Sequence, residues 1–393
     1  MKTKYNLAFL SILMYLGLNA GIVDVTYNTG SGSSWSQAQK AAFERAAKHW
    51  TDVLTPNHDI RVNAYLHNLY VFHGSNDSSW FRVLGYASAD QLYRDFPSSD
   101  PQFVANTFYH AALAQKLNGN AISSSTLPYH ITIHMNSSQK WYFGEHFSGI
   151  GPKEYDFTTV VLHELAHGLG FSSSARYDST LSAPVYNAAT PYSMDRFVYK
   201  NLGAVDMTSL PASGSSTTSF LTSNSLYFKG SEASSQNGGN RPKIYAPSSW
   251  VQGSSLSHWD LGYFGSLNKD KLMEPQAGFA NSHFFRQVGK VTRGFMSDIG
   301  WDVTMSVNEN SIAKRIKLFP NPSVSNLNIY IDDDVGKYQL RIRSITGKVC
   351  YENEISGNQI AIPIENWNSG VYTVELINSK TGSAQHQKFI KTN

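Results

Sequence analysis

Two histidines and a glutamate lie close together in the segment His163-Glu164-Leu165-Ala166-His167. Residues four positions apart share one face of an α-helix, so His163 and His167 can direct ring nitrogens at one metal ion. A glutamate placed like Glu164 acts as a general base toward a metal-bound water rather than as a ligand. The spacing therefore predicts a catalytic zinc site, against the alternative of two surface histidines beside an ordinary glutamate.

The sequence around this segment is typical of a buried helix with defined ends. Asp156 can cap its start, and an apolar run follows to Leu162. Gly168 and Gly170 come directly after the second histidine, and two glycines so close permit a sharp turn that ends the helix at Gly170. Histidines in a helix buried in this way need polar partners or a metal, which favours the metal site.

The composition narrows the chemistry that is available. The chain has 393 residues, a formal net charge of +3 and 16% charged residues, so no nucleic-acid partner is expected. Its single cysteine, Cys350, cannot form an internal disulfide, and a cysteine-ligated zinc site is excluded. Histidine, aspartate or glutamate must hold any zinc.

Residues 1–20 have the order of a secretory signal peptide. Lys2 and Lys4 precede an apolar run over residues 7–16, and small and polar residues follow. The run is too short for a comfortable membrane span, so the mature chain is expected to carry no transmembrane anchor. The protein is predicted to be secreted or bound at the cell surface.

The elements expected between the signal peptide and the zinc segment alternate between helix and strand. Residues 36–54 predict an amphipathic helix with a capping box, and residues 59–66 and 130–136 predict strands. This order is typical of an α+β domain, taken as residues 21–303. His130 and His134 lie on the same face of the second strand and could in principle bind a metal. Histidines at such positions are more often exposed residues than metal ligands, so exposure is expected here.

The composition changes twice in the remainder of the chain. Residues 172–255 are rich in Ser, Thr, Asn and Gly, which favours irregular structure. Residues 304–315 are interpreted as a linker. Residues 316–393 contain short alternating runs separated by turn residues, which predict a small all-β sandwich.

A catalytic zinc usually has three protein ligands, so a third must come from elsewhere. A glutamate on a following helix is disfavoured, because the next glutamate is Glu232, beyond the glycine break and a serine-rich region. In the compact three-histidine motif the third histidine follows the second by six residues, and here that position is Ser173. Serine is a poor zinc ligand at neutral pH. The best distant candidate is His258, with His283 and Asp260 left open as alternatives.

Three segments, residues 253–260, 271–275 and 291–301, together with residues 156–171, resemble the leishmanolysin-like branch of the metzincin metallopeptidases. The resemblance extends over about residues 22–303. It implies that His258 completes a site for one zinc ion and that Met273 forms the methionine turn beneath the metal. The fold class it implies is an α+β, metzincin-like zinc peptidase domain followed by the small all-β sandwich.

The function expected from this resemblance is that of a secreted zinc metalloendopeptidase acting on proteins or peptides. A zinc-activated water would attack the peptide bond with Glu164 as general base. The strand ending at residues 135–137 is expected to lie along the cleft and to pair with an extended substrate. The alternatives are a surface adhesin or carbohydrate-binding protein with a catalytically silent zinc site, and a zinc hydrolase that is not a peptidase. The sequence does not indicate whether structural calcium is present.

The C-terminal residues carry a second resemblance. Leu318-Phe319-Pro320-Asn321-Pro322, Ser369-Gly370-Val371-Tyr372 and Lys388-Phe389-Ile390-Lys391 occur in this order. Residues 316–393 are similar to the C-terminal sorting domain of type IX secretion substrates, which implies the type IX secretion machinery as a partner and export through the periplasm and outer membrane. An ordinary β-sandwich binding module is the alternative.

Overall fold

The structure is a computed structural model. It describes residues 23–29, 34–56, 58–119, 122, 128–145, 149–200, 205–265, 268–278, 285–305, 316–331, 337–356, 359–379 and 384–392. The signal peptide expected at residues 1–20, most of the expected linker and the alternative ligand His283 lie outside these residues.

A four-stranded sheet forms the centre of the larger part of the chain, in the order β1-β2-β6-β3. The strands are β1 (Val23–Thr29), β2 (Ile60–His67), β6 (Ile131–Asn136) and β3 (Gly85–Ala89). The first three run parallel and β3 is antiparallel to β6. The strands expected at residues 59–66 and 130–136 are therefore confirmed within one residue at each end.

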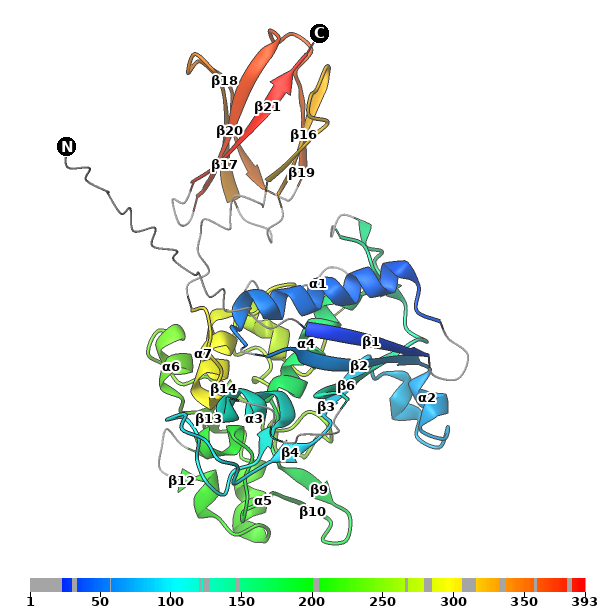
Figure 1. Cartoon of the computed structure of the whole chain (residues 1–393), viewed down its shortest axis with the longest axis vertical. Helices are drawn as coiled ribbons and strands as arrows, with labels where there is room; N and C mark the ends of the chain where they lie inside the picture. The colour runs from blue at the N-terminus through cyan, green and yellow to red at the C-terminus, as the bar shows by residue number, and fades with distance from the viewer. Residues whose placement is uncertain are drawn as a thin grey trace, which may run out of the picture.

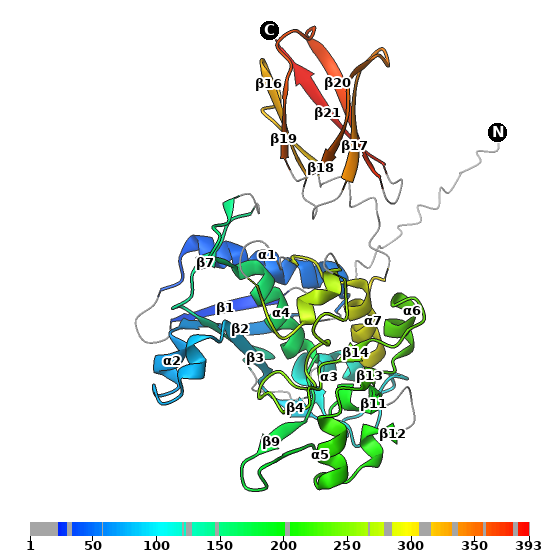
Figure 2. The ribbon, with the colours of Figure 1, turned by 180° about the vertical axis from the view of Figure 1, so that it is seen from behind.

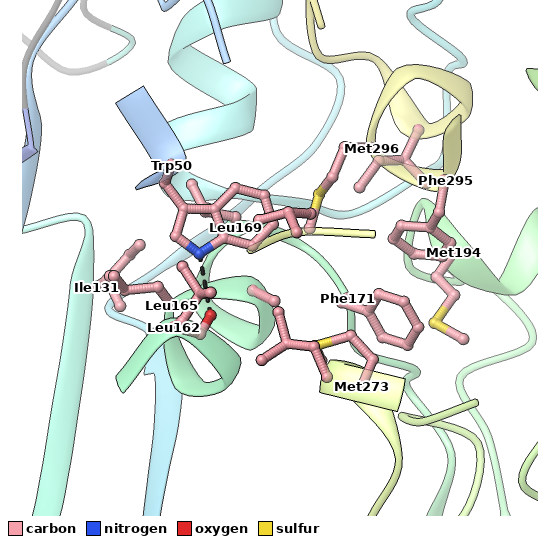
Figure 3. Close-up of a cluster of buried hydrophobic side chains, with 14 of the residues drawn as sticks. Trp50, Ile131, Leu162, Leu165, Leu169, Phe171, Met194, Met273, Phe295 and Met296 are labelled. Atoms are coloured by element: carbon pink, nitrogen blue, oxygen red, sulfur yellow. Dashed lines mark hydrogen bonds between the residues drawn. The ribbon is translucent and has the colours of Figure 1, made fainter. Parts of the chain in front are cut away.

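Two helices cover one face of this sheet. They are α1 (Gln37–Val53) and α4 (Phe157–Leu169), which pack against each other and against the strands (Figures 1 and 2). The capping box of Ser36 and Gln39 forms as expected at the start of α1. Trp50 of α1 donates a hydrogen bond from its indole nitrogen to the backbone oxygen of Leu162, at 3.0 Å (Figure 3). This bond ties the two helices together inside the core.

Gly168 brings α4 close to the sheet. A Cβ at this position would lie 2.3 Å from Cγ2 of Ile131 on β6, so only glycine permits the approach. Ile131, Ile133 and Met135 point from β6 into the core beneath the helices and are fully buried. The zinc segment is thus held on a helix that is packed directly on the sheet.

Short elements make up the rest of this part of the chain. The helices are α2 (Leu69–Phe72), η1 (Ser78–Phe81), α3 (Ala111–Asn118), η3 (Met194–Phe197), η5 (Met207–Ser209), α5 (Ser215–Leu221), α6 (Ser231–Gln236), η6 (Lys269–Met273) and α7 (Lys290–Ile299). Three small sheets pair β4 (Leu92–Tyr93) with β5 (Tyr109–His110), β7 (Trp141–Tyr142) with β8 (Tyr155–Asp156), and β9 (Arg176–Asp178) with β10 (Ala183–Val185).

Irregular structure dominates the described part of residues 172–255, as expected, and several short helices and strands interrupt it. This region includes β9 and β10 and a four-stranded sheet in the order β12-β11-β13-β14. The strands of that sheet are β11 (Val198–Lys200), β12 (Val205–Asp206), β13 (Leu226–Phe228) and β14 (Lys243–Ile244). Strands of two or three residues are too short to show an alternating pattern in the sequence, so these elements could not be expected from it.

Residues from Ile316 onward form two sheets around a core of their own. One sheet has the order β15-β16-β19 and the other β18-β17-β20-β21. The strands are β15 (Ile316–Phe319), β16 (Asn326–Ile331), β17 (Lys337–Ser344), β18 (Val349–Ser356), β19 (Gln359–Pro363), β20 (Gly370–Asn378) and β21 (Ala384–Lys391). The alternating runs expected to be strands do form strands.

The predicted fold class was an α+β, metzincin-like zinc peptidase domain followed by a small all-β sandwich, and the metzincin-like peptidase domain is the part that is wrong for this chain. Within described residues 23–305 the strands are distributed over five sheets of two to four strands. Helices α1 and α4 pack on the β1-β2-β6-β3 sheet. The physical reason is that short strands separated by Ser-, Asn- and Gly-rich turns pair with near neighbours in the sequence instead of extending a central sheet.

Candidate metal centre

Helix α4 begins and ends where its local sequence predicts. The carboxylate of Asp156 accepts hydrogen bonds from the backbone nitrogen and the hydroxyl of Thr159, at 3.0 and 2.6 Å. Gly170 ends the helix with φ 122°, a backbone conformation that favours glycine. A Cβ there would also lie 2.8 Å from Cδ1 of Ile299. The chain therefore turns within three residues of His167, as expected.

The structure brings three of the predicted ligands together. Nε2 of His163 lies 3.0 Å from Nε2 of His167 and 3.2 Å from Nε2 of His258. Among the described residues, these histidines are the group of three metal-binding side chains whose ligand atoms converge, all within 4.8 Å of one another. His258 reaches the site from the loop between β14 and η6.

On each histidine the opposite ring nitrogen, Nδ1, donates a hydrogen bond to a backbone carbonyl. The pairs are His163 with Leu272 at 2.6 Å, His167 with Phe171 at 2.7 Å, and His258 with Ser254 at 2.8 Å. A carbonyl oxygen can only accept, so each Nδ1 carries the proton of the neutral ring and each Nε2 carries a lone pair. Three lone pairs that face one another without a proton between them fit a bound cation. Hydrogen bonds from the opposite ring nitrogen to a carbonyl oxygen are also what generally orients histidines that bind metals.

Burial keeps these rings neutral. It lowers the pKa of His163 to about 4 and that of His167 to about 3, and it lowers the pKa of His258 well below its ordinary value. The neighbouring rings lower the pKa of His167 and His258 further. All three imidazoles are therefore in the form that binds metals throughout the neutral pH range.

Glu164 lies beside the histidines with only 5% of its surface exposed. Burial raises the pKa of its carboxyl to about 8. It lies close to Gly85 of β3, where an added Cβ would be 3.5 Å from Cγ of Glu164. Within the described part of the chain the carboxylate has no ion-pair or hydrogen-bond partner, so it is available for proton transfer.

Met273 ends the short helix η6 and is fully buried. Figure 3 shows it in the same apolar cluster as Phe171 and Leu165. Its backbone oxygen accepts a hydrogen bond from the backbone nitrogen of Trp259 at 2.9 Å, one residue after His258. Met273 thus lies at the site, and its role as the methionine of a turn beneath a metal stays a prediction.

The remaining candidates are occupied elsewhere or lie outside the described residues. Asp260 forms an ion pair with Lys243 at 2.9 Å, and Ser173 donates its hydroxyl hydrogen bond to Asp195 at 2.6 Å. His283 is not among the described residues. Asp195 is a fully buried carboxylate that sequence reasoning missed, because nothing in its local sequence indicates that it anchors the turn after α4.

The two strand histidines were expected to be exposed, and this was wrong. His130 is buried, with Nδ1 accepting from the backbone nitrogen of Arg61 at 3.1 Å and Nε2 lying 2.8 Å from Oε1 of Gln115. His134 is half-buried and its Nδ1 lies 3.0 Å from Nε2 of His67. The partners of His130 come from β2 and α3 and the partner of His134 comes from β2, and neither ring belongs to the candidate metal centre.

Two family models match separate parts of the chain. Residues 23–208 match a family described as SPBPB7E8-like, and residues 317–392 match the secretion system C-terminal sorting domain. No curated protein matches the chain.

Two solved structures are similar to short parts of the chain. One is a DUF3244 family protein from Bacteroides vulgatus with an immunoglobulin-like β-sandwich fold, 23% identical over 20% of this chain and 84% of that chain, with a TM-score of 0.18. The other is PorZ of Porphyromonas gingivalis, described as an essential bacterial surface component of the type IX secretion system. It is 17% identical over 24% of this chain and 14% of its own length, with a TM-score of 0.20.

The strands that follow residue 315 and the family match over the same residues identify the C-terminal part of the chain. In the described part of the chain, no helix has both the length and the apolar character needed to cross a membrane. Residues 317–392 are a secretion system C-terminal sorting domain, through which the chain interacts with the type IX secretion machinery, and the protein is secreted or held at the cell surface.

Proposed function

We propose that this protein is a secreted zinc-dependent metalloendopeptidase. The observation that carries the proposal is the convergence of three Nε2 lone pairs, on His163, His167 and His258, each set by a carbonyl partner on the same ring. Three imidazoles are a donor set that suits a catalytic zinc ion, whose fourth ligand is usually a water molecule. The adjoining carboxyl of Glu164 adds the proton acceptor that hydrolysis needs.

The chemistry divides between the ion and the chain. When bound, zinc supplies a Lewis acid for the scissile carbonyl and a water of lowered pKa. Glu164 takes one proton from the attacking water at a carboxylate oxygen while the new C–O bond forms. The same carboxyl then returns the proton to the amine as the C–N bond breaks. Burial raises the pKa of this carboxyl in the metal-free chain, and a cation bound beside it would lower that pKa again and favour the carboxylate that accepts the proton.

The position of β3 favours an extended peptide as the substrate. The strand ending at residues 135–137 was expected to be the edge that pairs with substrate, but β6 is paired on both sides, so this expectation is corrected. The outer strand on this side is β3, and its first residue, Gly85, packs against Glu164. An extended peptide added to β3 would lie next to the general base. Because such pairing uses backbone hydrogen bonds, it depends little on the side chains of the substrate.

The test compares the purified full chain with its Glu164→Gln variant on an unfolded protein substrate, with and without a zinc chelator. Glutamine keeps the size of the side chain but cannot accept the proton, so we expect cleavage to fall at least about 100-fold while zinc remains bound. Glu232→Gln is the matched control, because Glu232 is an exposed glutamate on α6. Chelator-resistant cleavage, or full activity in Glu164→Gln, would refute the mechanism.

A small ester and a small amide, assayed with the same preparations, separate the proposal from other zinc hydrolases. Hydrolysis of the ester without any cleavage of polypeptide would identify a hydrolase that is not a peptidase. Bound zinc with no hydrolysis of any of these substrates would point to a silent site on a binding protein.

A further inference from the structure

The hydroxyl group of Thr292 lies where three segments of the chain meet. Thr292 is in the first turn of α7 and is fully buried. Its Oγ1 donates a hydrogen bond to Oδ1 of Asp270 at 2.9 Å and accepts one from Nε1 of Trp259 at 3.1 Å. Both partners are also fully buried, so one oxygen atom links α7 to two other segments.

The first linked segment carries His258. Trp259 follows it directly, and the indole of Trp259 is fully buried against Phe171 and Phe295, with ring centroids 4.9 and 5.7 Å away. The hydrogen bond to Thr292 sets the direction of the indole within this apolar surrounding. Because Trp259 and His258 are neighbours in the chain, the orientation of the indole limits where the backbone of His258 can lie.

The second linked segment orients His163. Asp270 is fully buried in η6, and its carboxylate also accepts hydrogen bonds from the backbone nitrogens of Val291 and Thr292, at 3.3 and 2.7 Å. Two residues later, the carbonyl of Leu272 accepts the Nδ1 hydrogen of His163. The attachment of Asp270 to α7 therefore holds the carbonyl that determines the tautomer of His163.

We infer that Thr292 is a positioning residue for the candidate metal centre. Its hydroxyl bonds to Asp270 and to Trp259, and it thereby fixes two segments relative to each other. One is the η6 segment that orients His163, and the other is the loop that carries His258. The inference rests on the metal site of the proposed function. Neither Thr292 nor its two partners contributes a ligand, so its effect reaches the site through the carbonyl of Leu272 and the backbone next to His258. Groups that hydrogen-bond directly to metal-ligating histidines typically change metal affinity by about 10- to 100-fold when they are removed, and Thr292 acts through such a group, the carbonyl of Leu272.

The substitution Thr292→Val tests the inference with little change in volume, because it replaces the hydroxyl with a methyl group. The buried indole N–H of Trp259 then loses its hydrogen-bond acceptor, and the carboxylate of Asp270 loses one donor. We expect zinc affinity, measured by competition with a chelator, to weaken at least about tenfold. Thr292→Ser keeps the hydroxyl and should restore affinity to within about threefold of the wild type.

Thr217→Val is the matched control. Thr217 is also fully buried and its hydroxyl donates to the backbone oxygen of Pro211 at 2.7 Å, in a helix that carries no candidate ligand. This variant should lose stability as a buried hydrogen bond is removed, but should bind zinc as the wild type does. If Thr292→Val does not fold, Trp259→Phe removes the indole N–H and tests the same link from its other end.

A second measurement on the metal-free protein separates this inference from the proposed function. Nitrogen-15 spectra of the histidine rings report which nitrogen of His163 is protonated, and we expect the Nδ1–H form in the wild type and a mixture of tautomers in Thr292→Val. A wild type that binds no zinc would refute the proposed function, while the ring spectra would still test the positioning role. Unchanged zinc affinity in Thr292→Val, or an unchanged His163 tautomer, would overturn the inference.

Discussion

Nε2 of His163 lies 3.2 Å from Nε2 of His258, although 95 positions separate the two residues in the chain. Both rings are aligned by Nδ1 hydrogen bonds to backbone carbonyls, and the two planes are nearly parallel, with 24° between them. Such an arrangement requires that the loop before η6 be held firmly, because closing a long loop has an entropic cost. The candidate centre is therefore a product of long-range packing around a locally determined helix.

Removal of the imidazole at residue 258 should weaken zinc binding by more than about 100-fold in His258→Ala, since even outer-shell partners contribute about 10- to 100-fold. The control is Asp260→Asn, because Asp260 is paired with Lys243 and should leave zinc binding unchanged. Chelator competition measures both variants. Equal affinity in His258→Ala and the wild type would rule out His258 as the third ligand.

A side chain at residue 85 should reduce proteolysis. In Gly85→Ala the new Cβ would lie 3.0 Å from the backbone oxygen of His134 and from Sδ of Met135, and 3.5 Å from Glu164, so β3 or the glutamate must shift. Overpacking of this kind costs about 1–3 kcal/mol, and a displaced general base loses activity. Gly265→Ala is the control, since nothing lies within 4 Å of a Cβ there.

We expect kcat of Gly85→Ala to fall about tenfold or more, with zinc content unchanged. Steady-state kinetics on an unfolded protein substrate measures the change. Wild-type kcat in Gly85→Ala would show that the close packing between β3 and Glu164 has no catalytic importance.

The stability of the metal-free protein should depend on pH through Glu164. Burial raises the pKa of this carboxyl from an ordinary 4.5 to about 8, so between these values the folded state holds a proton that the unfolded state has lost. Stability from this group is present at low pH and is lost as the pH rises from about 4.5 through 8. Glu164→Gln has no such dependence.

Denaturant unfolding of chelator-treated wild type and Glu164→Gln at several pH values tests this directly. The unfolding free energy of the variant minus that of the wild type should increase across the window, by at most about 1.4 kcal/mol per pH unit, the limit for one proton. A difference that stays constant from pH 5 to 8 would contradict the raised pKa.

Deletion of residues 316–393 should stop release of the protein from the cell, because these residues include the sorting domain. We expect the shortened chain to remain inside the outer membrane, as detected by fractionation and immunoblotting. The full chain carrying His258→Ala is the control and should be exported normally. Appearance of the shortened chain in the medium would show that the C-terminal strands are dispensable for export.

The sequence by itself determined the features that depend on short windows. The cap at Asp156, the apolar run after it and the turn at Gly170 locate α4 within one residue, because each acts on backbone groups only a few positions away. The face shared by His163 and His167 follows from helix geometry alone. The strands after residue 315 and the resemblance to a sorting domain were likewise readable from local alternation and motif order.

Only the tertiary structure decided how these pieces meet. The carbonyls of Leu272, Phe171 and Ser254 set the histidine tautomers, and a backbone carbonyl has no sequence signature because every residue carries one. The chain also forms several small sheets in place of the expected domain, and β3 covers the strand that was taken for the edge. These outcomes depend on which distant segments pack together, and that is decided by the free energy of the whole core rather than by local pattern.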